Sequence, residues 1–299
     1  MKEGIKRSAW LQLIRLPNLL TVPGDPLAGF LLACGAAGVF PWARGAAAML
    51  AALCLYAFGL VLNDWADCEE DRRERPGRPL PSGRVSRGAA LALAAGLALA
   101  GLGAAFAGGA ACGLTALALV VMVAAYDLGL KSVPGAGPLA MGACRGLSLA
   151  MGAAASGAES WATAVVLAAA AGLTLYVAAV TLVASRETET LRVGLRRWAP
   201  ASVLAVLFVW AMAARVSGSW FFVVLAAAAV GWAALQGRRL AGTPGPAVVG
   251  RSVGGWIRGL LLIQAAFVST IPVWGWAPAA GLLLLWPVNV WLGRSFYAT

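Results

Sequence analysis

Long apolar segments recur along the whole chain and limit what it can fold into. Nine such segments lie near residues 10–38, 46–66, 88–108, 110–130, 138–157, 160–184, 198–215, 219–236 and 256–292. An α-helix of about 20 apolar residues crosses the hydrocarbon core of a bilayer. Hydrophobic residues make up 61% of the chain and charged residues 12%, about half of the roughly 25% charged residues of an ordinary soluble domain. The sequence therefore excludes a water-soluble globule.

The segments are continuous runs of Ala, Leu, Val and Gly. Transmembrane barrels instead use strands of about ten residues with alternating polarity, so membrane helices are favoured. We predict an all-α fold: a polytopic membrane bundle of about nine transmembrane helices in one domain over residues 1–299. Because the segment 256–292 is interrupted at Pro272, it is either one bent span or two.

Basic residues gather in alternate connections between the apolar segments. The other connections carry little beyond Arg44 and Arg215. By the positive-inside rule, this asymmetry places the N-terminus and the basic connections in the cytoplasm. We expect an integral, multi-pass protein of a bacterial-type inner membrane, surrounded by membrane lipids. Since the net charge of +11 lies in these connections, no nucleic-acid partner is expected.

Two missing features narrow the chemistry further. The chain has no histidine, which excludes His-ligated zinc and Ser-His-Asp catalysis in their usual forms. Its five cysteines are scattered singly, so neither a disulfide framework nor a CxxC metal site is indicated. Any acid, base or metal ligand must come from other side chains.

Six of the twelve acidic residues fall between Asp64 and Glu74, at the end of the second apolar segment. Within this run, Asn63, Asp67 and Asp71 are spaced i, i+4 and i+8, so a helix places them on one face. Such oxygen-bearing side chains repel one another unless a cation neutralises them, and Mg²⁺ prefers oxygen ligands that include substrate phosphates. We predict a Mg²⁺ site for a diphosphate substrate. Asp64 lies beside this face and either orients the ligands, binds an arginine or is itself a ligand.

At this point the sequence resembles a known family. The run NDWADCEEDRRERPGRPLPSGRVS, residues 63–86, is similar to the first signature of the UbiA-type membrane prenyltransferases, NDxxDxxxD followed by a basic RPxRPLPSG loop. The segments RLPNLLTVPGDPLAG, residues 15–29, and YDLGLK, residues 126–131, resemble the family as well. The resemblance implies a bundle around a central cavity that opens near the cytoplasmic face, where magnesium holds an isoprenyl diphosphate.

The second acidic motif of the family, DxxxD, corresponds here to the altered run Ser185-Arg186-Glu187-Thr188-Glu189. Ser185 follows Asn63, and Glu189 follows Asp67, at the same interval along the chain. The interval indicates two four-helix pseudo-repeats, about 10–130 and 138–236, followed by the helical segment 256–292. Glu189 and Glu187 are expected as metal ligands, and Ser185 as a weaker substitute for an aspartate.

Basic residues near both motifs are candidates for binding diphosphate. The resemblance favours Lys131, and arginine side chains bind phosphate oxygens in a bidentate way. Arg145 is a lone charge within the fifth apolar segment and needs a partner there. It either faces the diphosphate, an acidic ligand or the acceptor, or it pairs locally with Asp127 or backbone carbonyls. The full set of diphosphate-binding candidates is Lys131, Arg72, Arg78, Arg145 and Arg186.

The predicted function is Mg²⁺-dependent transfer of an isoprenyl group from its diphosphate to a hydrophobic or aromatic acceptor within the membrane. Asp67, Asp71 and Lys131 are the candidate catalytic residues. Tyr126, Tyr176 and Trp65 are candidates for a water-excluding wall of the cavity. The alternatives are a terpene cyclase or a phosphoribosyl-type transferase on the same scaffold, and a membrane transporter built from repeats.

Overall fold

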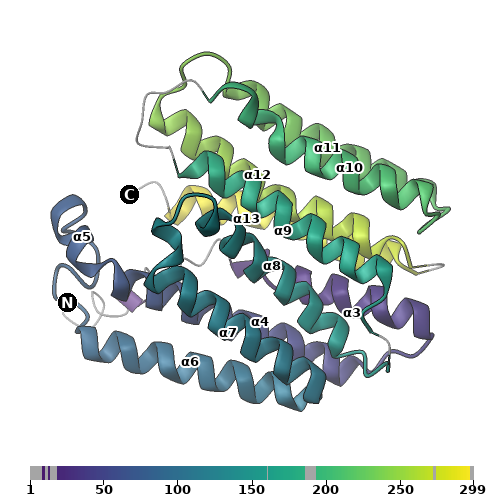
Figure 1. Cartoon of the computed structure of the whole chain (residues 1–299), viewed down its shortest axis with the longest axis horizontal. Helices are drawn as coiled ribbons and strands as arrows, with labels where there is room; N and C mark the ends of the chain where they lie inside the picture. The colour runs from purple at the N-terminus through teal and green to yellow at the C-terminus, as the bar shows by residue number, and fades with distance from the viewer. Residues whose placement is uncertain are drawn as a thin grey trace.

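The computed structural model describes residues 9–10, 13, 19–159, 161–185, 193–271 and 274–296, and the prediction of an all-α fold is confirmed for them (Figure 1). In these ranges the regular structure is entirely helical. The helices are α3 (Gly24–Ala37), α4 (Trp42–Ala66), α5 (Cys68–Glu74), α6 (Arg87–Ala107), α7 (Ala110–Leu128), η1 (Leu130–Ser132), α8 (Ala136–Ala154), α9 (Ala164–Ala184), η2 (Gly194–Trp198), α10 (Ala199–Ala213), α11 (Trp220–Arg239), α12 (Pro246–Val268) and α13 (Trp276–Phe296).

Length and composition make six of the described helical segments suitable for crossing a membrane: α4, α6, α7, α9, η2 with α10, and α11. The expected number of nine spans is thus not established by these criteria. The segment 256–292 falls on two helices, α12 and α13, neither of which is among the six candidate spans, so whether it forms one span or two stays a prediction. Helix α12 also begins earlier than the sequence pattern predicts, at Pro246, because a proline fits the first turn of a helix. The two pseudo-repeats stay a prediction.

Local sequence explains where several helices begin. Ser86, Thr163 and Ser219 precede α6, α9 and α11, and each side-chain oxygen accepts a hydrogen bond from a backbone N–H of the following first turn. Such caps satisfy N–H groups that a helix leaves unpaired at its start. These three helices therefore begin at polar residues that flank the apolar segments.

Helix α8 packs closely against both α3 and α9 through glycines. A Cβ atom at Gly29 would lie 1.9 Å from the carbonyl oxygen of Leu149, and one at Gly152 would lie 1.9 Å from the carbonyl oxygen of Pro26. On another face of α8, a Cβ atom at Gly142 would lie 2.1 Å from the carbonyl oxygen of Thr174. Only a residue without a side chain allows such backbone contact, which is how membrane helices associate.

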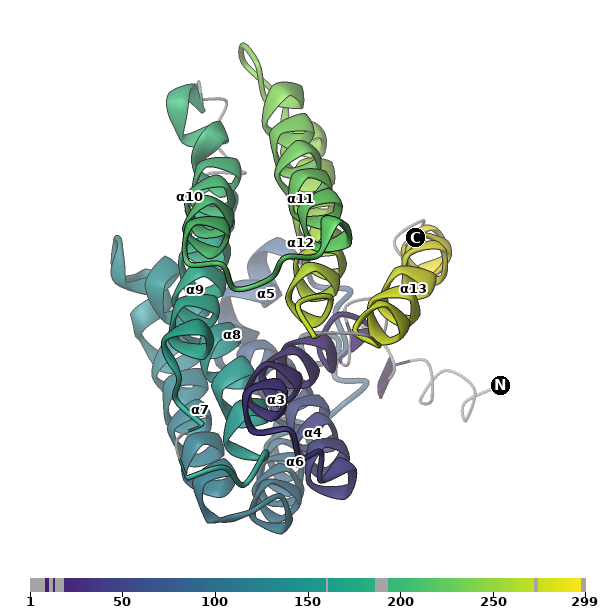
Figure 2. The same cartoon turned by 90° about the vertical axis from the view of Figure 1, so that its right-hand side faces the viewer.

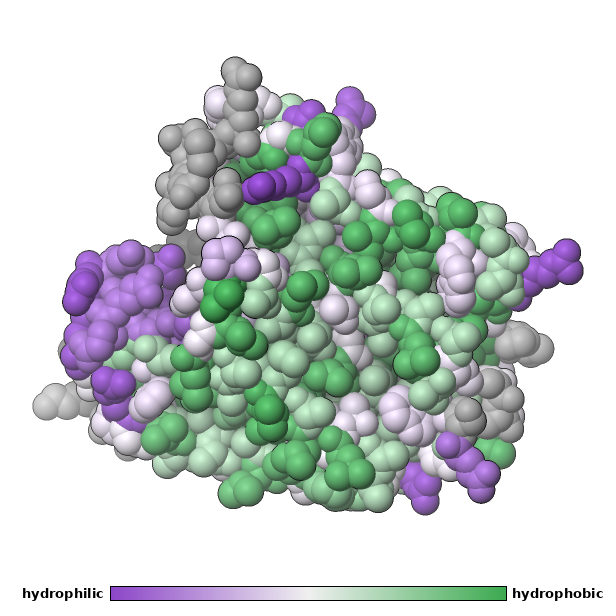
Figure 3. Space-filling view, in the orientation of Figure 1, coloured by the Kyte–Doolittle hydropathy of each residue, from purple (hydrophilic) through white to green (hydrophobic). Residues whose placement is uncertain are grey.

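The helices form two groups, one of α4, α6 and α7 and the other of α9, α10, α11 and α13, and helices α3, α8 and α12 connect these groups. Helices α4, α6 and α7 lie side by side, and α3 contacts α4, α8 and α12. Figure 2 shows α13 next to α12, on the side away from α9 and α10. Helix α5 projects at one end of the bundle, where Figure 3 shows hydrophilic residues gathered, while mostly apolar residues cover the middle of the visible face.

The glycine contacts of α8 give a stability prediction. Gly152→Leu should destabilise the purified protein by about 1–3 kcal/mol or more, because an added side chain overpacks the contact with α3. Gly103→Leu is the matched control, since a Cβ atom at Gly103 meets nothing within 4 Å. Thermal unfolding in detergent should show a lower melting temperature for the first variant alone. Equal melting temperatures would contradict the close contact.

Candidate functional site

The acidic run at the end of α4 keeps helical hydrogen bonding across a break in the helix. Helix α4 ends at Ala66 and α5 begins at Cys68, with Asp67 between them. The backbone N–H of Asp67 nevertheless donates to the carbonyl oxygen of Asn63 at 2.9 Å, and the N–H of Asp71 donates to the carbonyl oxygen of Asp67 at 2.8 Å. Asn63, Asp67 and Asp71, here called the acidic stripe, therefore follow one another at one-turn intervals, as the sequence spacing predicts.

Each side chain of the acidic stripe contacts a partner from elsewhere in the chain. The Asn63 Nδ2 group donates to Asp127 Oδ1 at 3.1 Å. The Asp67 carboxylate forms an ion pair with the Lys131 ammonium. The Asp71 carboxylate accepts a hydrogen bond of 2.6 Å from Arg78. The structure thus brings Lys131 and Arg78, two of the predicted diphosphate-binding residues, directly to the stripe.

Arg78 also approaches a second carboxylate. Its NH1 atom lies 3.6 Å from Asp64 Oδ1, and the Asp64 and Asp71 residues are each only 5% exposed. Two carboxylates sheltered from water require a nearby positive charge. Arg78 provides this charge from the loop after α5, so Asp64 lies beside an arginine, one of the three arrangements that the sequence leaves open for it.

The other arginine predicted for the first loop occupies a different place. The Arg72 guanidinium pairs with Glu69 at 2.8 Å, and its side chain is about half exposed. Glu69 also pairs with Arg87 at 3.1 Å, and the Arg87 guanidinium lies 5.1 Å from the centre of the Trp65 ring. Exposed pairs of this kind contribute little stability. Trp65, a candidate wall residue, therefore packs under a surface arginine.

Arg145 belongs to a buried polar cluster that joins α3, α8 and α12. Its Nε atom lies 2.7 Å from Asp25 Oδ2, and its NH2 group donates to the carbonyl oxygen of Thr21 at 3.1 Å. Gln264 Nε2 donates to the same carbonyl oxygen at 2.8 Å and to Asp25 Oδ1 at 2.7 Å. The sequence offered Asp127 or backbone carbonyls as local partners. Asp127 binds Asn63 instead, whereas the carbonyl partner is present at Thr21.

The polar cluster was missed by sequence analysis, although one signal was available. Asp25 and Gln264 are fully buried polar residues in apolar segments, and ionisable residues at such positions need partners. The residues are 239 positions apart, so no local spacing could pair them. The Arg145 guanidinium takes part in a contact between helices, and its predicted role at diphosphate stays a proposal.

Tyr176 and Tyr126, two of the three predicted wall residues, lie in different surroundings. Tyr176 is 1% exposed, and its hydroxyl donates to the carbonyl oxygen of Trp256 at 2.8 Å, so it connects α9 to α12. Tyr126 is half-buried on α7 and immediately precedes Asp127, which binds the acidic stripe. Of the two tyrosines, Tyr126 is therefore the one adjacent in sequence to a partner of the stripe.

The second acidic motif lies largely outside the described residues. Arg186, Glu187 and Glu189 belong to the range 186–192, which the structure does not describe. Ser185 is the last described residue of this region; it caps α9, and its hydroxyl donates to the carbonyl oxygen of Leu182 at 3.1 Å. The predicted ligand roles of Glu187 and Glu189 therefore stay predictions.

The acidic stripe has the donor chemistry of a magnesium site. Its ligand atoms are amide and carboxylate oxygens, which suit a hard divalent cation. Within the described part of the chain, no three His, Cys, Asp or Glu side chains are grouped so as to hold a metal ion, and Asp67 and Asp71 are paired with Lys131 and Arg78. These residues fit magnesium when the two cations turn away from the carboxylates.

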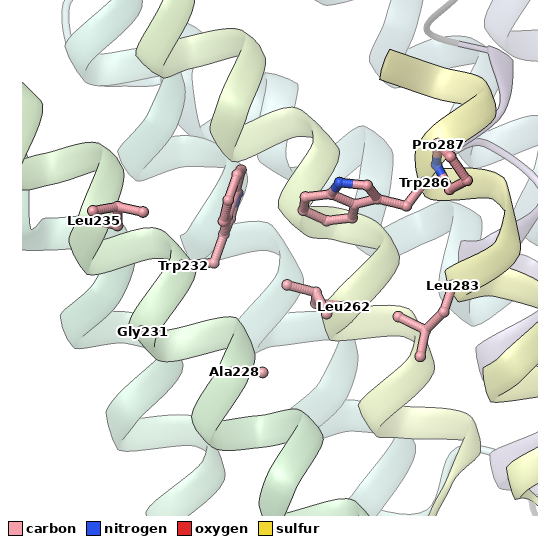
Figure 4. Close-up of a pocket in the computed structure, with 8 residues that line it drawn as sticks. All are labelled: Ala228, Gly231, Trp232, Leu235, Leu262, Leu283, Trp286 and Pro287. Atoms are coloured by element: carbon pink, nitrogen blue, oxygen red, sulfur yellow. The ribbon is translucent and has the colours of Figure 1, made fainter. Parts of the chain in front are cut away.

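Two larger hollows involve other residues. Figure 4 shows an apolar groove of about 480 Å³ between α11, α12 and α13, where the rings of Trp232 and Trp286 meet edge to face with centres 4.8 Å apart. A second cavity of about 730 Å³ is lined by the α10–α11 turn, with Arg215, and by residues that connect α12 to α13. Neither is lined by a residue of the acidic stripe.

The buried pair of Arg145 and Asp25 gives a second stability prediction. Asp25→Ala should destabilise the protein by about 3–5 kcal/mol, because it leaves a guanidinium without its counterion inside the bundle. The double variant Asp25→Leu/Arg145→Leu should be less destabilised than Asp25→Ala, since it removes both charges. Thermal unfolding of the purified variants measures the difference. A double variant at least as unstable as the single one would argue against the pair.

Several known proteins are similar to this chain in sequence. The model of the UbiA prenyltransferase family matches residues 26–250. A digeranylgeranylglyceryl phosphate synthase of Methanoculleus marisnigri is 32% identical over 152 residues, which cover 51% of this chain and 53% of the relative. The enzyme of the same name from Methanoregula boonei is 42% identical over 86 residues, or 29% of this chain and 31% of the relative. The chain thus spans about half the length, or less, of these curated relatives.

Solved structures share the fold. A UbiA homologue from Aeropyrum pernix K1 has a TM-score of 0.67 at 18% identity, covering 83% of this chain and 96% of its own. A UbiA homologue from Archaeoglobus fulgidus bound to DMAPP and Mg²⁺ has a TM-score of 0.61 at 16% identity, covering 89% of this chain and 99% of its own. At such identities the likeness concerns the fold. Since the family model covers most of the chain, the protein belongs to the UbiA prenyltransferase family.

Proposed function

We propose that the protein is a Mg²⁺-dependent prenyltransferase that transfers an isoprenyl group from an isoprenyl diphosphate to a hydrophobic acceptor in the membrane. One observation carries the proposal: the acidic stripe lies against two cationic side chains, Lys131 and Arg78. Carboxylates suit a metal ion, and the cations suit phosphate oxygens. Family membership supports it, as do the named activity of the relatives and the UbiA homologues bound to DMAPP or GPP with Mg²⁺.

The same side chains exchange partners when the substrate binds. Asp67, Asp71 and Asn63 would hold the metal, and Lys131 and Arg78 would then donate to diphosphate oxygens. Lys131 and Arg78 are partly exposed, with side-chain exposures of 22% and 27%, so both can turn without opening the bundle. Magnesium bound there supplies the positive charge that stabilises diphosphate as a leaving group. Arg72 and Arg145 are secondary candidates for the same substrate, because their acidic partners, Glu69 and Asp25, do not belong to the acidic stripe.

The transfer breaks the allylic C–O bond of the donor, whose electron pair leaves with diphosphate. The nucleophilic atom of the acceptor forms a new bond to the isoprenyl carbon and gives up its proton to diphosphate or water. The wall around the reacting carbon must exclude water meanwhile. We assign this task to Tyr126 and Trp65, which lie on α7 and α4 near the stripe, and retain Tyr176 as a more distant wall residue. The relatives are named as synthases of a prenylated glyceryl phosphate, so a glyceryl phosphate lipid is one acceptor of the proposed hydrophobic class.

The second acidic motif completes the proposal. Glu189 and Glu187 would add carboxylate ligands, Ser185 a weak or water-mediated one, and Arg186 a phosphate contact. The regular interval between the two motifs supports this assignment, since the family resemblance predicts that both face one substrate. A serine where the family pattern has an aspartate lowers the expected affinity for a second metal ion.

An assay of diphosphate release separates the proposal from its alternatives. The purified protein is incubated with Mg²⁺ and either isoprenyl diphosphates of graded length or phosphoribosyl diphosphate, with or without a membrane lipid extract. A transferase releases diphosphate in step with a prenylated lipid product. A terpene cyclase releases it without an acceptor, a transporter releases none, and a phosphoribosyl-type transferase acts only on phosphoribosyl diphosphate. Any of these last three outcomes would overturn the proposal.

The acidic residues give the matching mutational prediction. Asp71→Asn should lower acceptor-dependent diphosphate release at least 100-fold, because it removes a charged metal ligand, while the melting temperature stays near that of the wild type. Glu189→Ala should also lower it, though less. Glu74→Gln is the control, since Glu74 is exposed on the same short helix. Near-normal release by Asp71→Asn would rule out the metal assignment.

We also propose that the end of the bundle that carries α5 faces the cytoplasm, because the arginine-rich connections require it. Gly77→Cys should react with a membrane-impermeant maleimide only after cells are permeabilised. Val39→Cys, 67% exposed on the connection between α3 and α4, should react in intact cells. The wild type, whose described cysteines are buried or half-buried, gives the background. The reverse labelling pattern would contradict the proposed orientation.

A further inference from the structure

Asp127 is a buried carboxylate that contacts the acidic stripe without belonging to it. It lies near the end of α7, is 4% exposed, and accepts the hydrogen bond of 3.1 Å from Asn63 Nδ2. The sequence resemblance assigns a role to Tyr126 and Lys131 on either side of it but none to Asp127. A buried carboxylate is costly in an apolar bundle, so its presence beside a proposed metal ligand calls for a physical reason.

The contact is one of two parallel connections between α4 and the end of α7. Asn63 and Asp67 are one helical turn apart, and their partners Asp127 and Lys131 are separated by the same four residues. Both connections therefore fix the register of the same two segments. Figure 1 shows that α4 and α7 lie close together and run towards the end that carries α5.

The two connections differ in what substrate binding does to them. Lys131 must leave Asp67 in order to contact diphosphate, so that connection opens during the proposed reaction. The Asp127 carboxylate is not a ligand for phosphate, and Asn63 can bind a metal ion through its side-chain oxygen alone. The hydrogen bond between Asn63 and Asp127 can therefore stay in place. An ionised carboxylate can only accept hydrogen bonds, so it always selects the NH₂ side of the amide. The Oδ1 atom of Asn63 is then the end that remains for the metal ion.

We propose that Asp127 is a positioning residue that fixes the amide orientation of Asn63, so that Oδ1 is presented to Mg²⁺, and keeps α4 and α7 in register when Lys131 moves to diphosphate. This inference rests on the proposed function, because it requires a metal ion at the acidic stripe. Residues that orient metal ligands through hydrogen bonds commonly change metal affinity about 10- to 100-fold when they are replaced.

Binding of Mn²⁺ alone to the purified protein, followed by electron paramagnetic resonance, tests this role without turnover. Mn²⁺ occupies the same oxygen sites as Mg²⁺. Asp127→Ala should raise the dissociation constant about 10-fold, and Asp127→Asn should raise it less, because its amide oxygen can still accept from Asn63. Thr115→Ala is the control on α7, where Thr115 Oγ1 donates only to its own helix, at Ala111. Wild-type Mn²⁺ affinity in both Asp127 variants would overturn the proposal.

A double-variant cycle shows whether Asp127 acts through Asn63. In an Asn63→Ala background, Asp127→Ala should cause no further loss of Mn²⁺ affinity, whereas independent effects would add; a full additional loss would overturn the proposal. Asp71→Asn distinguishes the failure modes. If Asp71→Asn leaves Mn²⁺ binding unchanged, both the proposed function and the role of Asp127 are refuted. If Asp71→Asn removes binding but Asp127→Ala does not weaken it, only the role of Asp127 is refuted. Melting temperatures identify any variant that does not fold, and Asp127→Asn then carries the test.

Discussion

Neutralisation of the carboxylates at one end of the bundle is the constraint on which the site depends. Asp64 and Asp71 are buried, and Asp67 is partly so. Three negative charges so close to apolar helices are unfavourable unless cations or a metal ion compensate them. Lys131 and Arg78 provide that compensation from segments that are distant along the sequence. The ion pairs therefore attach α4 both to the end of α7 and to the loop that follows α5.

Backbone packing elsewhere allows these segments to meet. The glycines of α8 let α3 and α9 approach until carbonyl oxygens touch the helix backbone. The ion pair of Arg145 with Asp25, together with Gln264, adds a polar connection among α3, α8 and α12. Close packing and a buried polar cluster together hold the interior.

Much of the site was predictable from sequence because its spacing is local. Asn63, Asp67 and Asp71 occupy one helical face whether or not the helix breaks at Asp67, since the backbone hydrogen bonds continue through it. The positions of most apolar helices were predictable for the same reason, because each reflects a continuous run of residues. The segment expected near 10–38 is an exception, since turns at residues 20–23 precede α3 (Gly24–Ala37). The division into α12 and α13 was less predictable, since Pro272 indicates a break without indicating how the chain continues. The partners of Arg145 and Asn63 come from other helices. A polar residue in an apolar segment signals that a partner is needed, but one sequence does not show which residue it is.

The basic residues differ in whether their carboxylate partners belong to the proposed metal site. Lys131 and Arg78 pair with carboxylates that are themselves proposed to bind magnesium, so a metal ion bound there would release both cations beside the proposed diphosphate site. Arg145 pairs with the fully buried Asp25, for which the described part of the chain shows no second ion-pair partner. Releasing Arg145 would leave an uncompensated charge in the bundle, whereas releasing Lys131 and Arg78 exchanges one compensated arrangement for another. The physical distinction between a structural cation and a proposed substrate-binding cation in this protein is therefore the availability of a second counterion for its carboxylate.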